Sequence, residues 1–256
     1  MVWRADWLPH ETASRYGGRV TTGRAHKAPL LEVLGIRKSF RRGPEEVHAL
    51  DDVDLSLSVG EVVGLIGPSG SGKTTLLNVL YGWEDPAAGA VRWVEGDSEA
   101  RAERRPWRDV AIVPQDLGLL EELSARENAE LPVRLAGLSG EQYQARVDRL
   151  LRAFGLDTYA DRRLGEISLG EQQRVALARA LILVPRLILA DEPTGHQDAK
   201  WALAVFRAFR WISGRGTTCL VATHSREFLK TVDRVITIRD GHLRHEERTR
   251  GDEAKP

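Results

Sequence analysis

The sequence is short of cysteine and has no excess of charge of either sign. Its 256 residues include one cysteine, Cys219, which excludes an internal disulfide and a metal site built from several thiolates. Lysine and arginine together number 37, as do aspartate and glutamate, so the formal net charge is zero. Proteins that bind nucleic acid usually carry a basic excess. The charge balance therefore argues against a nucleic-acid partner.

The sequence also lacks a long hydrophobic run. A helix that crosses a bilayer needs about 20 consecutive apolar residues. The run that comes nearest, 176–190, is interrupted by Arg179, Pro185 and Arg186. Arg4 and Asp6 stand where a signal peptide would have its apolar segment. We therefore expect a soluble, cytoplasmic protein that serves a membrane only from its inner face and through a partner.

The two ends of the chain differ from its middle. Residues 1–29 show neither the period of a strand nor that of a helix, and we expect a flexible or loosely docked extension there. Residues 248–256 are charged and have no large apolar side chain, which is typical of a solvated tail. Residues 30–247 are expected to form the folded domain.

Hydrophobic patterning predicts alternating strands and helices in this domain. The predicted strands are 30–40, 53–59, 61–66, 91–94, 110–113, 187–190, 218–222 and 235–238. The predicted helices are 74–81, 170–183, 200–212 and 225–231, with an inserted helical subdomain over 117–169. Asp240-Gly241 is typical of a tight turn between two final strands. The expected fold class is α/β, with a mostly parallel sheet core and an antiparallel β part.

A phosphate-binding loop is predicted between the strand 61–66 and the helix 74–81. Residues 67–74 match the pattern G-x-x-x-x-G-K-[ST], which is typical of P-loop NTPases. Glycines let several backbone N–H groups point at phosphate oxygens, and the helix N-terminus adds a partial positive charge. The alternative is a Gly/Ser turn before a helix. The expected nucleotide-binding residues are Gly67, Pro68, Ser69, Gly70, Ser71, Gly72, Lys73, Thr74 and Thr75.

Two carboxylates follow the apolar strand 187–190. Strand carboxyl ends in a parallel sheet face the ligand crevice. Asp191 is then placed to bind Mg²⁺ together with the Thr74 hydroxyl, and Glu192 to activate an attacking water. An acidic pair that starts a turn before Pro193 is the alternative.

Further segments resemble the motifs of one family. Residues 167–174, Ile-Ser-Leu-Gly-Glu-Gln-Gln-Arg, resemble the signature sequence of the ATP-binding cassette (ABC) ATPases. Gln115 resembles the family's Q-loop residue, 195–198 its D-loop, His224 its switch histidine and Phe40 its adenine-stacking aromatic. Order and spacing agree from about residue 30 to 244. Segments 119–132, 170–176 and 191–195 resemble the branch with lipoprotein-release, macrolide-efflux and cell-division ATPases.

The resemblance implies an ATPase that uses ATP and Mg²⁺ and powers separately encoded permease subunits. It implies a head-to-tail dimer, in which Ser168, Gly170 and Glu171 of one chain act on the partner's ATP and Asp198 links the two sites. Catalysis is implied for Glu192, His224 and Gln115. Metal binding is implied for Thr74, Gln115 and Asp191.

The sequence departs from the family in three motifs. In the signature, Leu169 stands where glycine is usual, and Glu171 is one of the tolerated variants of the last residue. In the D-loop, His196-Gln197 stand where Asn-Leu is usual, and in the Q-loop Pro114 stands where an aromatic residue is common. We expect Leu169 to lie against its own helical subdomain or against the membrane partner. We assign no role to His196.

Several residues keep an alternative interpretation. Gln115 fits an exposed loop, His224 a packed histidine, Asp198 a helix start and Phe40 the core. Ser168 and Glu171 also form the capping pattern S-x-x-E, which is compatible with phosphate contact. For the whole chain, one alternative is a soluble ABC ATPase that acts on DNA or ribosomes. Another is a regulatory cassette with weak turnover.

Overall fold

The computed structural model describes residues 28–95, 98–102, 107–195 and 197–248. Its strands are β1 (Pro29–Arg42), β2 (Glu45–Ser58), β3 (Val62–Ile66), β4 (Ala88–Glu95), β5 (Ser98–Ala102), β6 (Val110–Val113), β7 (Leu187–Asp191), β8 (Thr218–Ala222), β9 (Arg234–Arg239) and β10 (His242–Arg248). Its helices are α1 (Lys73–Tyr81), α2 (Ala125–Leu135), α3 (Glu141–Ala153), α4 (Leu169–Leu181), α5 (Ala199–Ser213) and α6 (Arg226–Leu229). Most of the expected extension and tail, and His196, lie outside the described residues.

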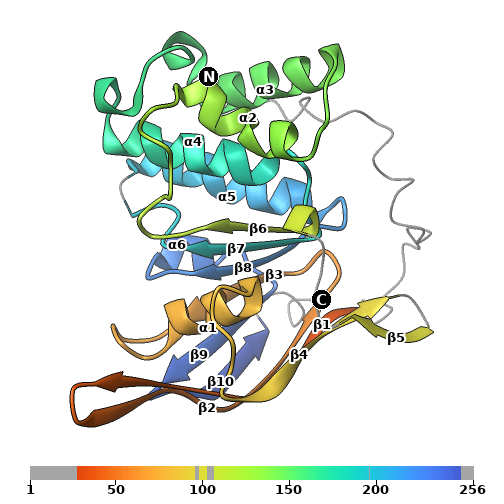
Figure 1. Ribbon diagram of the computed structural model, residues 1–256, viewed down its shortest axis with the longest axis vertical. Helices are drawn as coiled ribbons and strands as arrows, with labels where there is room; N and C mark the ends of the chain where they lie inside the picture. Colours follow the sequence, from red (N-terminus) through yellow and green to blue (C-terminus); the bar gives the residue numbers. More distant parts are fainter. Residues whose placement is uncertain (1–27, 96–97, 103–106, 196, 249–256) are drawn as a thin grey trace, which may run out of the picture.

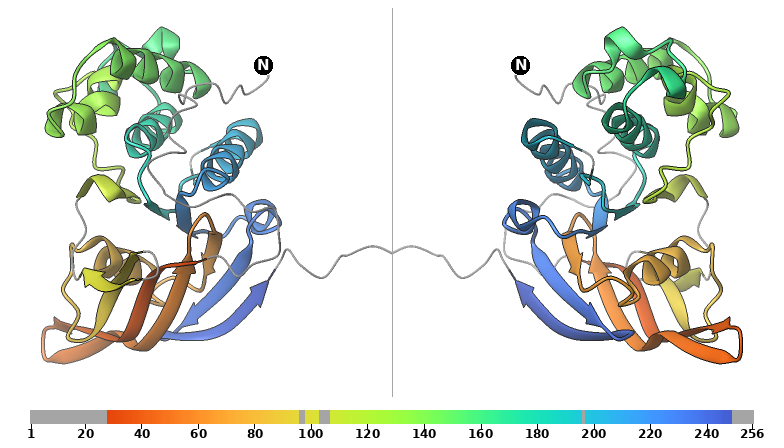
Figure 2. Two further views of the ribbon diagram at one scale, coloured as in Figure 1. Left: turned by 90° about the vertical axis from the view of Figure 1, so that its right-hand side faces the viewer. Right: turned by 90° about the vertical axis from the view of Figure 1, so that its left-hand side faces the viewer.

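Two sheets organise the domain (Figure 1). The larger has the strand order β10-β9-β3-β8-β7-β6, and its strands from β9 to β6 are parallel. The smaller is antiparallel, with the order β2-β1-β4-β5. Helix α1 lies between the two sheets, while α4 and α5 cover the other face of the larger sheet and α2 and α3 lie beyond them (Figure 2). The predicted fold class is confirmed.

The parallel strands are apolar because both of their faces are buried. Along β7, Ile188 and Ala190 pack under the helical layer, whereas Leu187 and Leu189 pack toward α1 and the antiparallel sheet. Successive strand residues point to opposite faces, so such a strand shows a continuous apolar run and no alternation. Cys219 in β8 lies in the helical-side core, and its burial raises the pKa of the thiol.

The inserted helical part is built from α2 and α3. Val147, Leu150 and Leu151 are buried on α3, at the spacing of one helix face. Helix α2 packs against α3 and α4. Residues 154–168 contain only two short 3₁₀ turns, 157–159 and 164–166. The helical content of 117–169 is therefore concentrated in its middle.

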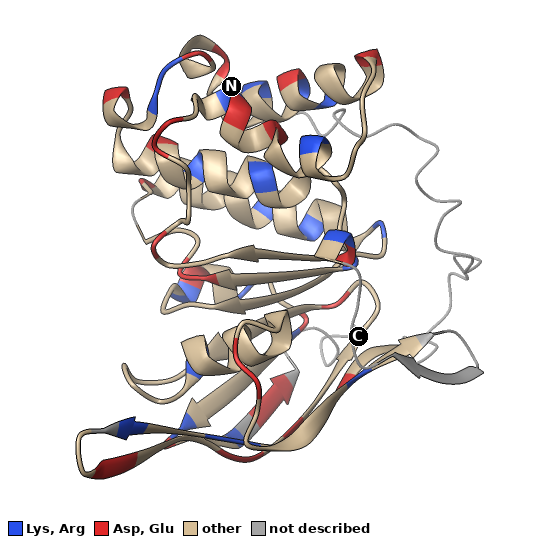
Figure 3. Ribbon diagram, in the orientation of Figure 1, with Lys and Arg blue, Asp and Glu red and all other residues tan. Residues whose placement is uncertain are grey.

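The antiparallel part is where prediction and structure differ most. Strand β2 begins eight residues before the predicted 53–59, because it pairs with β1 along a long hairpin. Strand β5 was not predicted, since the only apolar residues of its sequence, Ser-Glu-Ala-Arg-Ala, are alanines, which are not strong strand formers. The turn at Asp240-Gly241 has φ of 50° and 77° and joins β9 to β10, as predicted. Basic and acidic residues both occur in the helical layer and on the hairpin (Figure 3).

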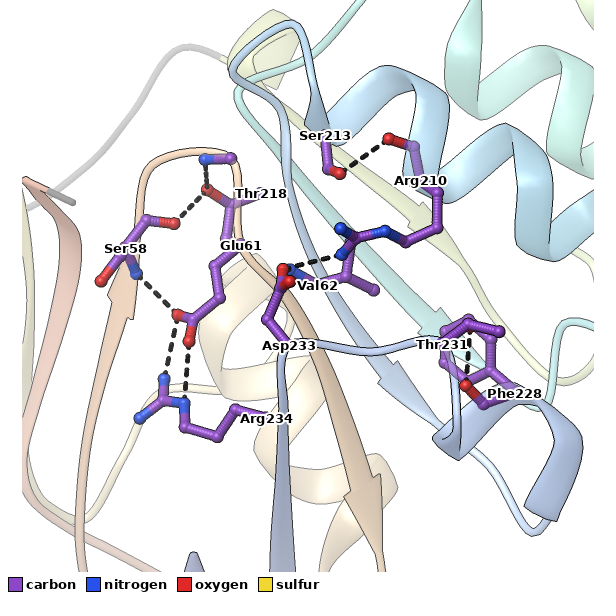
Figure 4. A network of polar contacts seen from close by, with 11 residues as sticks. Ser58, Glu61, Val62, Arg210, Ser213, Thr218, Phe228, Thr231, Asp233 and Arg234 are labelled. Carbon is purple, nitrogen blue, oxygen red and sulfur yellow. Dashed lines mark hydrogen bonds and ion pairs between the residues drawn. The ribbon is translucent and has the colours of Figure 1, made fainter. Parts of the chain in front are cut away.

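A polar network joins the amino-terminal ends of the parallel strands to the antiparallel sheet and to α5 (Figure 4). Arg234 Nε lies 3.0 Å from Glu61 Oε1, and its Nη2 lies 3.1 Å from Glu61 Oε2. Glu61 also accepts a hydrogen bond of 3.0 Å from the Ser58 backbone N–H. Arg210 Nη1 lies 2.8 Å from Asp233 Oδ2. The network fixes the edge of the sheet opposite to the predicted nucleotide site.

Breaking this network is expected to destabilise the fold. Glu61→Ala should lower the free energy of unfolding by about 2 kcal/mol, because Arg234 stays buried and loses a two-point partner while it keeps Glu246. Urea unfolding of the full chain measures the loss. Glu227→Ala is the control: it removes an exposed ion pair with Lys230 and should cost less than about 1 kcal/mol. Equal losses in the two variants would contradict a structural role for the network.

Candidate functional site

The carboxyl ends of four neighbouring parallel strands carry most of the predicted site. In the sheet order β3, β8, β7 and β6, these strands are followed by the loop 67–72, His224, Asp191-Glu192 and Gln115. Segments far apart in the sequence thus lie along one edge of the sheet (Figure 1). In open parallel sheets this edge is where ligands bind.

Close backbone contacts shape the loop between β3 and α1. Gly72 has φ 106°, and a Cβ atom there would lie 2.4 Å from the Ala49 carbonyl oxygen. A Cβ atom at Gly67 would lie 2.2 Å from the Ile238 carbonyl oxygen. Only glycine fits these two positions without moving the backbone. The loop is therefore held against β2 and β9.

The side chains of Ser71 and Lys73 are buried at this loop. Lys73 Nζ donates hydrogen bonds to the carbonyl oxygens of Gly67 and Pro68, at 2.8 and 3.0 Å. Ser71 Oγ is buried and has no hydrogen-bond partner among the described residues. A buried hydroxyl without a partner is unusual. The loop therefore has an ammonium and a hydroxyl available for an anion.

Thr74 and Asp191 are in direct contact across the sheet edge. The Thr74 hydroxyl donates a 2.6 Å hydrogen bond to Asp191 Oδ2. Asp191 is buried, at 5% exposure. The structure thus brings together two oxygen-bearing side chains that were predicted to share one metal ion. Mg²⁺ prefers oxygen ligands of this kind.

Glu192 and His224 face each other next to this pair. His224 Nε2 lies 3.5 Å from Glu192 Oε1, which is buried and has no hydrogen-bond partner within the described part of the chain. Glu192 has φ 47°, a left-handed conformation that is uncommon for glutamate. Its backbone N–H donates to the Ala222 carbonyl oxygen at 2.9 Å. The His224 side chain is 60% exposed, so the alternative of a packed histidine is wrong.

Gln115 lies in an exposed loop after β6, as its alternative interpretation also required. The following residues are clamped by Arg179 from the last turn of α4, whose guanidinium donates 2.6 Å hydrogen bonds to the carbonyl oxygens of Leu117 and Gly118. Leu117 is buried and has φ 63°. Burial lowers the pKa of Arg179. Arg179 therefore fixes the shape of the loop that carries Gln115.

The signature residues lie at the amino end of α4. Ser168 is the N-cap and forms the predicted capping box with Glu171, which is confirmed. Burial alone would raise the pKa of Glu171, but the hydrogen bonds from Ser168 outweigh it and the pKa lies below its ordinary value. Leu169 is 48% exposed, so it does not pack into its own subdomain. That leaves a partner as its expected contact.

Asp198 and Phe40 lie outside this cluster. Asp198 caps α5 by accepting a 2.9 Å hydrogen bond from the Trp201 backbone N–H, so its helix-start interpretation is confirmed. Phe40 on β1 is 40% exposed, and Lys38 Nζ lies 5.2 Å from its ring centre. Phe40 is therefore not a core residue.

No individual role was predicted for four residues that the structure places at the site: Gln173, Arg174, Arg179 and Gln197. Gln173 and Arg174 are buried, at 2% and 7% exposure, and hydrogen-bond to the segment after β7. In the sequence, these two residues could be noticed only as polar residues next to the apolar positions of α4. This pattern indicated that these side chains need partners but not which ones.

Comparison with known proteins identifies the family. The model of the family described as ABC transporter matches residues 50–195. The chain belongs to the ABC transporter family. It is an ATP-binding cassette and an ATPase, as predicted. No helix within the described residues is long and apolar enough to cross a bilayer.

Individual relatives agree with this assignment. The lipoprotein-releasing system ATP-binding protein LolD 2 of Caulobacter vibrioides is 41% identical over 220 residues, covering 84% of this chain and 96% of the relative. The macrolide export ATP-binding/permease protein MacB of Azoarcus sp. is 40% identical over 222 residues, and there the chain spans 33% of the relative. A dimeric ATP-binding cassette bound to ADP and Pi matches with TM-score 0.78 and 31% identity, over 87% of this chain and 100% of that one. The predicted branch is confirmed.

Removing the Lys73 ammonium is expected to weaken ATP binding. Lys73→Ala should raise the Kd for ATP by about 10- to 100-fold, the value of one or two lost charge-assisted hydrogen bonds. Isothermal calorimetry with the full chain measures it. Lys230→Ala, on the exposed surface of the same chain, is the matched control. Equal affinities in both variants would contradict the assignment of the phosphate loop.

Proposed function

We propose that this chain works as a homodimeric ATPase that powers separate permease subunits for export, release or transmembrane signalling. The observation that carries the proposal is the Thr74–Asp191 contact next to the Glu192–His224 pair at the edge of the parallel sheet. These four side chains supply metal ligands, a base and a hydrogen-bond donor within one site. The relatives named for lipoprotein release and macrolide export support the link to a membrane partner.

A second chain completes each ATP site in this proposal. The chain has one phosphate loop and one signature sequence, and the solved relative with ADP and Pi is a dimer. Ser168 and Gly170 of the partner subunit, with Glu171 completing the capping box, then meet the γ-phosphate at the amino end of α4. The partial positive charge of a helix N-terminus favours that anion. Asp198 lies near the interface, and Phe40 stacks on adenine.

The residues at the sheet edge fit Mg²⁺. Thr74 Oγ1 and Asp191 Oδ2 are oxygen donors 2.6 Å apart, and Gln115 follows β6, the strand next to β7. We assign Thr74, Asp191 and Gln115 to the ion. When bound, it would neutralise charge on the β- and γ-phosphate oxygens. The Ser71 hydroxyl, which has no hydrogen-bond partner in the ranges that the structure describes, is a further donor for the phosphates.

Glu192 acts as the base in the hydrolysis step. A water oxygen attacks the γ-phosphorus while Glu192 accepts the proton of that water, and the bond from phosphorus to the β–γ bridging oxygen breaks. The products are ADP and phosphate. His224, 3.5 Å from Glu192 Oε1, orients the carboxylate and donates to the γ-phosphate. Gln115 orients the water from the β6 side.

A membrane partner is proposed to dock beside the Gln115 loop. An apolar cavity of about 270 Å³ lies between the end of α1, β6, α2 and α4. Trp83, Trp107 and Leu135 line it and are exposed at 56%, 47% and 68%. Arg179 lines the same cavity, so an occupant would contact the clamp on the loop. The chain would then lie on the inner face of the membrane. A soluble role on DNA or ribosomes is not favoured by the relatives.

Replacing the base tests the hydrolysis step. Glu192→Gln keeps the size of the side chain and removes its basicity, so turnover should fall by about 10²- to 10⁴-fold while ATP still binds. Steady-state ATPase, calorimetry and light scattering follow turnover, binding and the ATP-dependent dimer. Glu122→Gln, in an exposed loop, is the control. Near-normal turnover of Glu192→Gln would remove Glu192 from this role.

The signature departure is tested by two neighbouring variants. Leu169→Gly should change the ATPase rate by less than about twofold, because an exposed side chain that faces away from the phosphate contributes little to it. Gly170→Asp should abolish activity by steric clash and by repulsion of the γ-phosphate, with an unchanged circular dichroism spectrum. A large gain from Leu169→Gly would instead favour a regulatory cassette whose native signature is weak.

A further inference from the structure

The side chain of Gln197 connects the loop after β7 to the signature helix. Its Nε2 donates hydrogen bonds to the Gly170 carbonyl oxygen at 2.8 Å and to Gln173 Oε1 at 2.9 Å. Its Oε1 accepts from Arg174 Nη1 at 3.1 Å. A side-chain amide has two N–H donors, and both are used here. The amide is therefore held in one orientation by three groups of α4.

Gln173 extends this connection to the proposed base. It is buried at 2% exposure, and its Nε2 donates a 2.9 Å hydrogen bond to the Glu192 carbonyl oxygen. The side chains of Gln173 and Gln197, which we call the amide relay, thus run from the carbonyl of Gly170 to the carbonyl of Glu192 within one chain. Buried hydrogen bonds in series polarise one another, so such a network responds as a unit.

Each end of the relay holds a backbone group that matters for ATP. At one end, Glu192 has φ 47° and needs external contacts to keep this conformation. At the other end, Gly170 lies in the first turn of α4. In the proposed dimer Glu192 acts on the ATP of its own chain, whereas Gly170 acts on the ATP of the partner. The relay therefore spans from one ATP site to the other.

Residues of α5 also contact the relay and its neighbours. The Arg174 guanidinium lies 4.2 Å from the ring centre of Trp201 in α5. Asp198, next to Gln197, caps α5 through the Trp201 N–H. Helices α4 and α5 thus both contact the relay, and a shift of α4 at Gly170 would reach the Glu192 carbonyl through the hydrogen bonds of Gln197 and Gln173.

We propose that the amide relay couples the two ATP sites of the dimer, with Gln173 and Gln197 as positioning residues. A γ-phosphate bound against Gly170 of one chain sets the peptide of Glu192 in the same chain for catalysis at the other site. The proposal rests on the dimeric function above, and adds the residues that carry the signal between the sites.

Gln197→Leu in the full chain tests the relay. Leucine is similar in size and makes no hydrogen bonds, so the Hill coefficient for ATP should fall to 1. The kcat should fall by about tenfold, a part of the ~10²–10⁴ that a positioned general base contributes. The KM of the variant for ATP and its Tm should stay close to the wild-type values. Gln197→Glu keeps the acceptor for Arg174 and loses both donated bonds. It should show the same loss of cooperativity, and it serves if the leucine variant does not fold.

Gln172→Leu is the matched control. Gln172 is the neighbour of Gln173 on α4, but its Nε2 donates to the Leu164 and Ile167 carbonyl oxygens, outside the relay. The Hill coefficient of the Gln172→Leu variant for ATP should match that of wild type. Wild-type cooperativity in a folded Gln197→Leu or Gln197→Glu protein overturns the relay and leaves the dimer intact. Failure of ATP to dimerise the Glu192→Gln chain, with a wild-type Hill coefficient of 1, overturns the dimeric function and the relay together.

Discussion

The in-step pairing of parallel strands is the constraint on which the site depends. Leu65 pairs with Ala222, Ala222 with Asp191, and Ala190 with Val113, so β3, β8, β7 and β6 end nearly level with one another. The residues that follow these strands therefore leave the sheet at the same height. They lie side by side although they belong to segments far apart in the sequence. A slip of one residue would exchange the two faces of a strand. Because both faces are buried in different cores, each register is fixed by packing on two sides.

Helix α4 is the second rigid element, because it contacts the site at three levels. Gly170 lies in its first turn, Gln173 about one turn further and Arg179 in its last turn, and the distance from the first to the last is about 14 Å at the usual helical rise. The same helix thus touches the signature region, the carbonyl of Glu192 and the loop after Gln115. A rotation of α4 would therefore displace the contacts of Gly170, Gln173 and Arg179 together.

Local patterns predicted the parts of the molecule that are determined locally. Four features could be predicted because each needs only neighbours in the sequence. They are the phosphate loop, the capping box of Ser168 and Glu171, the turn at Asp240-Gly241 and the apolar strands. The length of β2 was not, because it depends on pairing with β1. The contact between Gln197 and Gly170 joins residues 27 positions apart. It follows from how α4 packs beside β7, which no local pattern contains. The left-handed φ of Glu192 is likewise a product of tertiary contacts.

The buried position of Cys219 has a practical consequence for measuring movements of the chain with attached labels. The thiol of the chain's single cysteine is fully buried in β8 and resists ionisation, so it is a poor nucleophile toward maleimides and oxidants while the protein is folded. The native cysteine therefore contributes little to reactions with thiol reagents while the protein is folded. A cysteine introduced at an exposed position would carry a fluorophore or spin label alone, with no native residue to remove first. Distances between two such labels could then be recorded in a chain whose core is unaltered.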